Sequence, residues 1–121
     1  MWIGFFVVLA IPLAFLAFRV ARNWNQVQWR VLERQGDLAS KQYEWDKAAR
    51  IFSNALEAAA NLRPRASKLC TSQTQLHLGT VRYHQNRTEE ARELFQASIQ
   101  SVESAGLAPA ASDAKRQLGL I

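Results

Sequence analysis

Few side chains in this sequence could do chemistry, and two histidines come first among them. His77 and His84 are seven residues apart, which places them two turns apart on the same side of a helix. Histidine pairs that bind a metal favour closer spacing and need further ligands. We therefore expect two imidazoles that line a surface or face solvent, and no metal site.

The remaining candidates for catalysis have simpler explanations. Cys70 is the only cysteine, so neither an intrachain disulfide nor a cysteine-based metal cluster can form, and we expect it to be a small packed residue. Glu89, Glu90 and Glu93 suit the first turn of a helix, where carboxylates compensate the helix dipole. A glycine-rich phosphate loop, a nucleophile elbow and a paired-cysteine motif are all missing. The sequence therefore predicts a protein that is not an enzyme and uses no cofactor.

The size and charge of the chain restrict the choice further. Its 121 residues allow one small domain, and its formal net charge is +5. Such a charge can indicate nucleic acid, but basic residues beside a hydrophobic segment are also explained by anionic lipid headgroups. We expect no nucleic-acid partner.

Residues 1–18 are the hydrophobic segment, and they contain no charged side chain. As a helix they would be about 27 Å long, close to the roughly 30 Å hydrocarbon core of a bilayer. Basic and aromatic residues flank the run, as they do at the ends of membrane helices. The residues expected at the membrane interface are Trp2, Arg19, Arg22 and Trp24. The pattern predicts a transmembrane anchor at 1–18 and a juxtamembrane segment at 19–28.

Two alternatives to the anchor are a cleaved signal peptide and a buried helix of a soluble protein. A signal peptide would carry its basic residues before the apolar run, whereas here the arginines follow it. The same arginines favour a single-pass topology, with the N-terminus outside and the soluble domain on the cytoplasmic or equivalent side.

The rest of the chain shows apolar residues at helical spacing, with no stretch that alternates as a strand would. Proline does not recur after Pro12 until Pro64, which would begin a helix, and Thr88 would be the N-cap of another. The expected fold class is all-α. The expected helices cover residues 24–42, 45–62, 64–84 and 88–105, followed by a short helix at 112–118, and the first of them could be continuous with the helix at 1–18.

A glycine, an alanine and a phenylalanine recur in the same arrangement with a period of 43 residues. In each set the alanine follows the glycine by twelve residues and the phenylalanine follows the alanine by four. The sets are Gly36, Ala48 and Phe52, then Gly79, Ala91 and Phe95. Glycine lets two helices approach, alanine suits a helix crossing and phenylalanine fills the space between helix pairs. A well-packed antiparallel bundle of another kind would use the same residues.

With Leu32 and Ala55 in the first set and Leu78 in the second, this pattern resembles the tetratricopeptide repeat family. The resemblance implies a helical domain at 29–105, with repeats at about 29–62 and 72–105, and a tail at 106–121 with a short capping helix. Arg82 stands where the family has a tyrosine, and the closing prolines are missing. The long period implies an elongated second helix or a longer linker around residues 63–68.

The resemblance also implies a groove lined by the first helix of each pair. The side chains expected there are Arg30, Glu33, Arg34, Asp37, Lys41, Gln73, His77, Thr80 and His84. Asp37 and Thr80 stand where a clamp for a peptide carboxylate would need asparagine, which argues against a clamp for chaperone tails. The alternative for each of these residues is a solvated helix face.

These observations predict a membrane-anchored protein–protein interaction module that acts as a scaffold or assembly factor for a membrane complex. The alternative is a permanent accessory or structural subunit of a large membrane complex. Expected partners are proteins of that complex and the lipid bilayer. Because two helix pairs are fewer than a repeat stack usually needs, the end faces should be covered by the 112–118 helix, a second copy or a larger assembly.

Overall fold

Five α-helices and one short 3-10 helix make up the fold in this computed structural model. The structure describes residues 2–121, with side chains for residues 12–19 and 23–121. In chain order the elements are α1 (Trp2–Lys41), α2 (Trp45–Ala60), α3 (Pro64–His84), α4 (Thr88–Glu103), η1 (Ala108–Ala111) and α5 (Ser112–Leu120). Residues 2–121 contain no strand, so the described chain is all-α.

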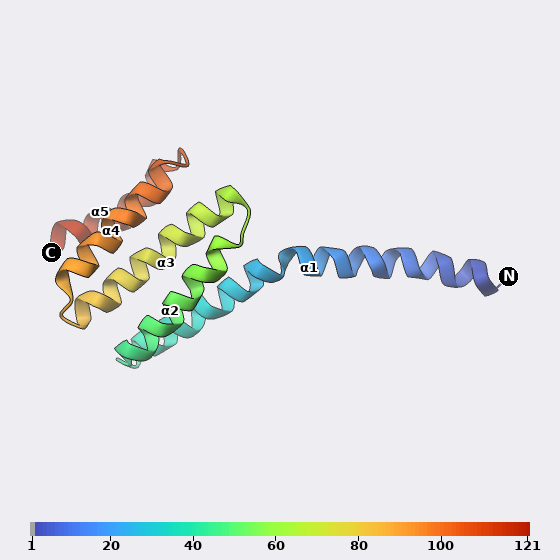
Figure 1. Cartoon of the computed structure of the whole chain (residues 1–121), viewed down its shortest axis with the longest axis horizontal. Helices are drawn as coiled ribbons and strands as arrows, with labels where there is room; N and C mark the ends of the chain where they lie inside the picture. The colour runs from blue at the N-terminus through green and yellow to red at the C-terminus, as the bar shows by residue number, and fades with distance from the viewer. Residues whose placement is uncertain (1) are drawn as a thin grey trace.

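The helices pack as two antiparallel pairs with a cap. The second half of α1 lies against α2, α2 lies against α3, and α3 lies against α4, so that neighbours in sequence are neighbours in space. The short helix α5 and η1 cover the outer side of α4. The first half of α1 extends away from the other helices as a single rod (Figure 1).

The expected transmembrane helix at 1–18 is wrong. Among the helices within residues 2–121, none combines the length and the apolar character needed to cross a bilayer. The apolar run does not form a helix of its own. It is the first part of the 40-residue helix α1, which continues through Arg19 into a long polar segment.

The single-pass localisation, with the N-terminus outside and the domain on the cytoplasmic side, is wrong on the same finding. Of the four expected interface residues, Arg19 and Trp24 are exposed on α1. The expectation for Trp2 and Arg22 concerns side chains that the structure does not describe.

The two turns that join the helices of each pair have the same geometry. Tyr43 and Asn86, 43 residues apart, both adopt a left-handed backbone conformation, with φ of 60° and 65°. The amide of the residue after each donates to a carbonyl of the preceding helix, Glu44 to Ala39 and Arg87 to Arg82. Thr88 is not an N-cap as expected, because α4 begins at Thr88 itself, and the preceding residue makes no capping side-chain hydrogen bond.

The extra length between the repeats lies at the beginning of α3. Helix α2 has 16 residues and α3 has 21, and only Asn61–Arg63 separate them. The expected elongated second helix or long linker at 63–68 is therefore wrong. Because Pro64 can occupy the first turn of a helix without losing a hydrogen bond, α3 begins there and not after residue 68.

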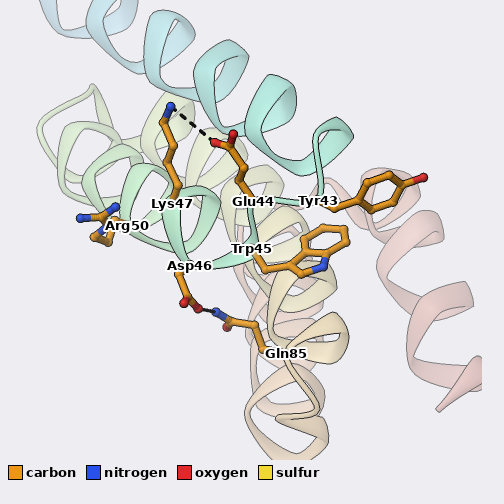
Figure 2. Close-up of a pocket in the computed structure, with 7 residues that line it drawn as sticks. All are labelled: Tyr43, Glu44, Trp45, Asp46, Lys47, Arg50 and Gln85. Carbon is orange, nitrogen blue, oxygen red and sulfur yellow. Dashed lines mark hydrogen bonds and ion pairs between the residues drawn. The ribbon is translucent and has the colours of Figure 1, made fainter.

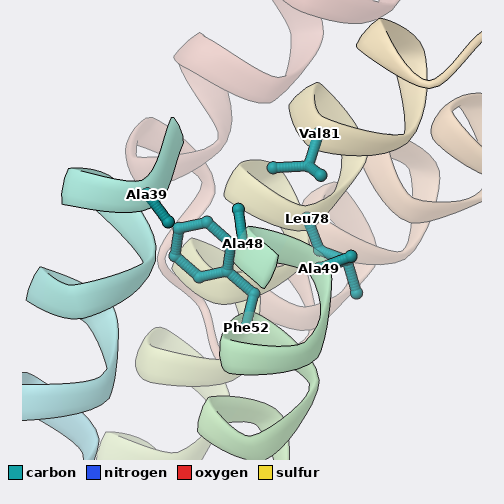
Figure 3. Packing of buried hydrophobic residues seen from close by; sticks show 6 residues of the cluster. All are labelled: Ala39, Ala48, Ala49, Phe52, Leu78 and Val81. Carbon is teal, nitrogen blue, oxygen red and sulfur yellow. The ribbon is translucent and has the colours of Figure 1, made fainter. Parts of the chain in front are cut away.

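The repeated glycine, alanine and phenylalanine lie where the helices of each pair approach most closely. The Phe52 ring, 1% exposed, lies over Gly36, where an added Cβ would come within 2.6 Å of Phe52 Cε1. Ala48 is fully buried beside it (Figure 3). The ring therefore occupies the space that the missing side chain of Gly36 leaves.

The second pair repeats this packing. A Cβ on Gly79 would lie 2.7 Å from Phe95 Cε1, and Ala91 is fully buried. Leu78 and Val81 of α3 pack against Ala49 and Phe52 of α2, which joins the two pairs into one core (Figure 3). Ala55 is also fully buried and belongs to a second cluster around Trp29.

Candidate functional site

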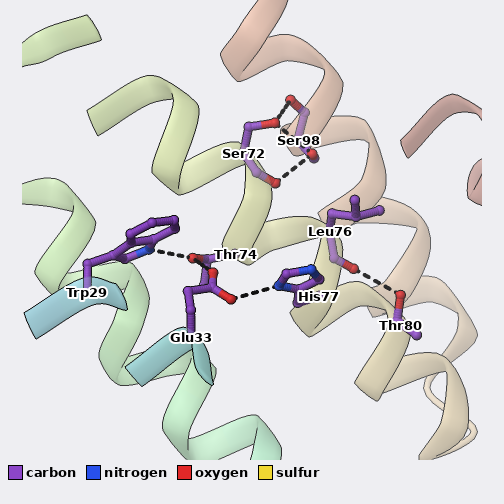
Figure 4. A network of polar contacts seen from close by, with 8 residues as sticks. All are labelled: Trp29, Glu33, Ser72, Thr74, Leu76, His77, Thr80 and Ser98. Carbon is purple, nitrogen blue, oxygen red and sulfur yellow. Dashed lines mark hydrogen bonds and ion pairs between the residues drawn. The ribbon is translucent and has the colours of Figure 1, made fainter. Parts of the chain in front are cut away.

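A buried polar network joins the first helices of the two pairs. Trp29 Nε1 of α1 donates a hydrogen bond of 2.9 Å to Thr74 Oγ1 of α3, and the Thr74 hydroxyl donates to Glu33 Oε1. The other carboxylate oxygen of Glu33 lies 2.7 Å from His77 Nδ1 (Figure 4). Trp29, Glu33 and Thr74 are buried, and His77 is partly exposed. Four side chains from two helices thus satisfy one another's hydrogen-bonding groups.

The network shifts the pKa of His77. Burial by itself lowers the pKa of His77, but the hydrogen bond with Glu33, the charge of Glu33 and the charge of Asp37 outweigh burial and raise it above the ordinary histidine value. Within the described side chains, no buried nitrogen or oxygen lacks a hydrogen-bond partner. A protonated His77 facing a buried carboxylate is therefore the arrangement that this site favours.

Two of the residues expected to line a groove, Glu33 and His77, thus contact each other. Glu33 is 7% exposed and has little surface for a partner. The His77 ring also lies 5.4 Å from the Phe52 ring, which ties it to the core. Both residues hold α1 and α3 together, and of the two only His77 keeps an exposed part.

The other expected groove residues divide between an exposed row on α1 and scattered positions on α3. On α1, the side chains of Arg30, Arg34, Asp37 and Lys41 are exposed. On α3, Gln73 is exposed, Thr80 donates to the Leu76 carbonyl oxygen at 3.1 Å, and His84 stacks on Trp45 with ring centroids 4.4 Å apart. His84 lies at the turn end of the domain and does not belong to the same surface as Gln73.

A cleft of about 380 Å³ lies between α3 and the C-terminal cap. Helix α3 supplies Leu69, Gln73, Leu76 and His77, while Asp113 of α5 lies on the other side. Sequence reasoning missed Leu69, Leu76 and Asp113. The spacing of 69, 73 and 76 follows one helix face and could have identified the α3 side, but nothing in the sequence places α5 opposite it.

A second hollow, of about 580 Å³, lies at the turn end. Figure 2 shows its side chains: Tyr43 points outward, while Trp45 lies against the domain. The Asp46 carboxylate accepts a 2.7 Å hydrogen bond from the side-chain amide Nε2 of Gln85. This bond connects the turn region of the first pair to that of the second. Sequence reasoning missed this hollow because both turns were expected to be only connections.

The described side chains offer neither a metal-binding cluster nor an activated thiol. No group of three or more histidine, cysteine, aspartate or glutamate side chains in the part of the chain that the structure describes could hold a metal ion. Cys70 is buried against the second core cluster, and burial, followed by the charge of Glu33, raises the pKa of its thiol. A protonated, buried thiol is a poor nucleophile.

Comparison with known proteins agrees with this architecture. A family model described as tetratricopeptide repeat matches residues 30–104. No curated protein and no solved structure matches the chain. The matched segment runs from the second half of α1 to the end of α4 and contains both sets of packing residues. Since the match covers more than half of the chain, this protein belongs to the tetratricopeptide repeat family.

Proposed function

We propose that this protein is an adaptor that binds an extended segment of a partner protein in the cleft between α3 and α5. Tetratricopeptide repeats point to a protein–protein interaction module. The observation that carries the proposal is the cleft itself, in which apolar and polar side chains of α3 face the C-terminal cap. The scaffold or assembly role would follow from holding a partner at this cleft.

The lining of the cleft suggests which groups of a partner it accepts. Leu69, 37% exposed, and Leu76 offer an apolar contact for an aliphatic or aromatic side chain. Gln73 offers both a donor and an acceptor to a peptide backbone. The Asp113 carboxylate favours a hydrogen-bond donor or a cation on the partner.

The exposed row on α1 would extend this surface. Arg30 and Lys41 bring two positive charges and Asp37 one negative charge. Long-range attraction from such side chains raises association rates more than it raises affinity. We therefore propose that contacts in the α3 cleft supply most of the binding affinity. The charged side chains of α1 would orient the partner as it approaches.

An assembly factor and a permanent subunit differ in stoichiometry. Affinity purification of the full chain, followed by quantitative mass spectrometry, would give substoichiometric and variable partners for an assembly factor. A fixed ratio of one chain to each partner would favour the permanent subunit instead.

The test of the cleft is a pair of substitutions, Leu69→Ala with Gln73→Ala. Because each removes an exposed side chain, the fold should remain, and partner recovery should fall by about tenfold or more. The control is Asn54→Ala with Glu57→Ala on the outer side of α2, which should leave recovery unchanged. Circular dichroism melting checks that all variants are folded. Equal recovery with both variants would exclude the cleft as the binding surface.

A further inference from the structure

A row of apolar side chains lies exposed on the face of α1 opposite the one that packs in the domain. The members are Leu13, Trp24, Val27, Val31 and Leu38, which are 44% to 64% exposed; before Arg19 the helix also exposes Phe15, Leu16 and Phe18, so the apolar surface there extends around the helix. The opposite face of the same helix holds Trp29 and Ala39, which are 7% and 3% exposed. We call the exposed row the outer stripe. Solvent exposure of several large apolar side chains in one row indicates a surface that another molecule covers.

The spacing of the outer stripe is that of a coiled coil. Together with Ala17, Val20 and Arg34, its residues follow one another at alternating intervals of four and three along α1. The full series is Leu13, Ala17, Val20, Trp24, Val27, Val31, Arg34 and Leu38. In the sequence this is the heptad pattern of helices that pair along one face. At 1.5 Å per residue the series is about 38 Å long, which covers nearly four heptads.

The ends of the repeat stack indicate which molecule covers the stripe. At the C-terminal end α5 and η1 pack on α4, so that end already has a cap within the chain. At the other end, no described helix packs on the outer stripe of α1 (Figure 1). Head-to-tail stacking of copies is blocked by the C-terminal cap, whereas face-to-face pairing of two N-terminal ends is open. A surface that pairs with itself produces a closed dimer with twofold symmetry.

We infer that two copies of this chain associate through a parallel, in-register pairing of their α1 helices along the outer stripe. In this register each apolar layer of one copy meets the same layer of its partner. The first half of α1, which extends from the domain, is then paired as well (Figure 1). An antiparallel pairing would instead set Leu13 against Leu38 and would place the two domains at opposite ends of the pair.

The single charged layer lowers the stability of the in-register arrangement. Arg34 is exposed and occupies the one layer of the series that is not apolar, so two Arg34 side chains lie side by side in the pair. The long arginine stems let both charged groups reach solvent at the edge of a two-stranded pair. Along the flanks, Asn23 would face Gln28 of the second copy and Arg30 would face Gln35, so no like charges oppose each other there.

The test is the mass of the full chain in solution, measured by size exclusion with multi-angle light scattering over a dilution series. The wild-type chain should have twice its 13.7 kDa mass. Val27→Glu with Val31→Glu should weaken association by at least about a hundredfold, because two carboxylates per chain would be desolvated. The control, Gln96→Glu with Gln100→Glu on the exposed face of α4, adds the same charge and should remain dimeric.

A disulfide crosslink tests the register. In a Cys70→Ser background, Val27→Cys should form a disulfide-linked dimer under mild oxidation, because like residues meet in a parallel pair. Gln96→Cys is the matched control and should not crosslink. A wild-type mass of one chain at all concentrations, or a dimer that survives both glutamates, would overturn the inference. So would a monomer that sediments with phosphatidylcholine vesicles only when the outer stripe is intact, since lipid would then cover it.

Discussion

The Glu33 carboxylate and the His77 ring, 44 positions apart in the sequence, meet at 2.7 Å between α1 and α3. Through Thr74 and Trp29 this contact becomes a continuous buried connection between the two repeats. Packing of Phe52 and Phe95 holds each helix pair together. The polar network adds a specific connection between the pairs, which sets the position of α1 relative to α3, the helix that supplies one side of the candidate cleft.

Removing the carboxylate should destabilise the domain. Glu33→Ala leaves the Thr74 hydroxyl and the His77 ring without their partner in a buried site, which should cost about 2–3 kcal/mol of unfolding free energy. Urea unfolding followed by circular dichroism measures it. Glu57→Ala, on the outer face of α2, is the control and should change stability by less than about 0.5 kcal/mol. Equal effects of the two substitutions would mean that the network contributes nothing.

The raised pKa of His77 predicts how stability depends on pH. The folded state binds the proton more tightly than the unfolded state, where histidine has a pKa of about 6.5. The contribution to stability is therefore complete below that value and is lost as the pH rises through the higher pKa of the folded state. Urea unfolding at a series of pH values should show this decline. Glu33→Gln should flatten it, and an unchanged slope in that variant would contradict the assignment.

The close approach of Gly36 to Phe52 predicts a second kind of instability. A methyl group on Gly36 would lie 2.6 Å from the ring, so Gly36→Ala should force the helices apart and cost about 1–3 kcal/mol. Adding Phe52→Leu should recover part of this loss, so the double variant is less unstable than the sum of the two single ones. Gly119→Ala is the control, because its added Cβ meets nothing within 4 Å. Strictly additive effects would mean that the ring does not limit the approach.

The packing of each pair could be predicted from the sequence because its signal occurs twice. Gly36 and Gly79, with the alanines and phenylalanines that follow them, have the same spacing, and one helical geometry explains both sets. The network around Glu33 could not be predicted in the same way. It joins residues of different repeats and depends on how the pairs are rotated against each other, which no local spacing encodes.

The continuity of the apolar run with the helix that follows it is one of the possibilities that the sequence leaves open. Between Phe18 and Lys41 the sequence contains no proline, and its single glycine, Gly36, is tolerated inside a helix. Nothing therefore ends a helix at residue 18, and the apolar run continues into the domain as α1. The composition of the sequence shows where apolar residues give way to polar ones. A helix boundary depends instead on helix-breaking residues and on capping residues.

The turn at Tyr43 predicts a stabilising substitution. Tyr43 has φ of 60°, in the left-handed region that tyrosine disfavours, while Asn86 occupies the equivalent position of the second turn. Tyr43→Asn should therefore stabilise the domain by up to about 1 kcal/mol, since asparagine tolerates this conformation. Thermal unfolding measures the change, and Asn86→Ala should have the opposite effect. Destabilisation by Tyr43→Asn would show that the outward Tyr43 ring, edge-on to Trp45, contributes more than the backbone costs.

The central claim is that this domain binds a partner protein at the cleft between α3 and α5. Amide hydrogen exchange of the full chain, with and without a co-purified partner, tests it most directly. We expect new protection in α5 and in the part of α3 that carries Leu69, Gln73 and Leu76, with none on the outer side of α2. Protection confined to α2 and α4, with α3 and α5 exchanging as in the free chain, would contradict the claim.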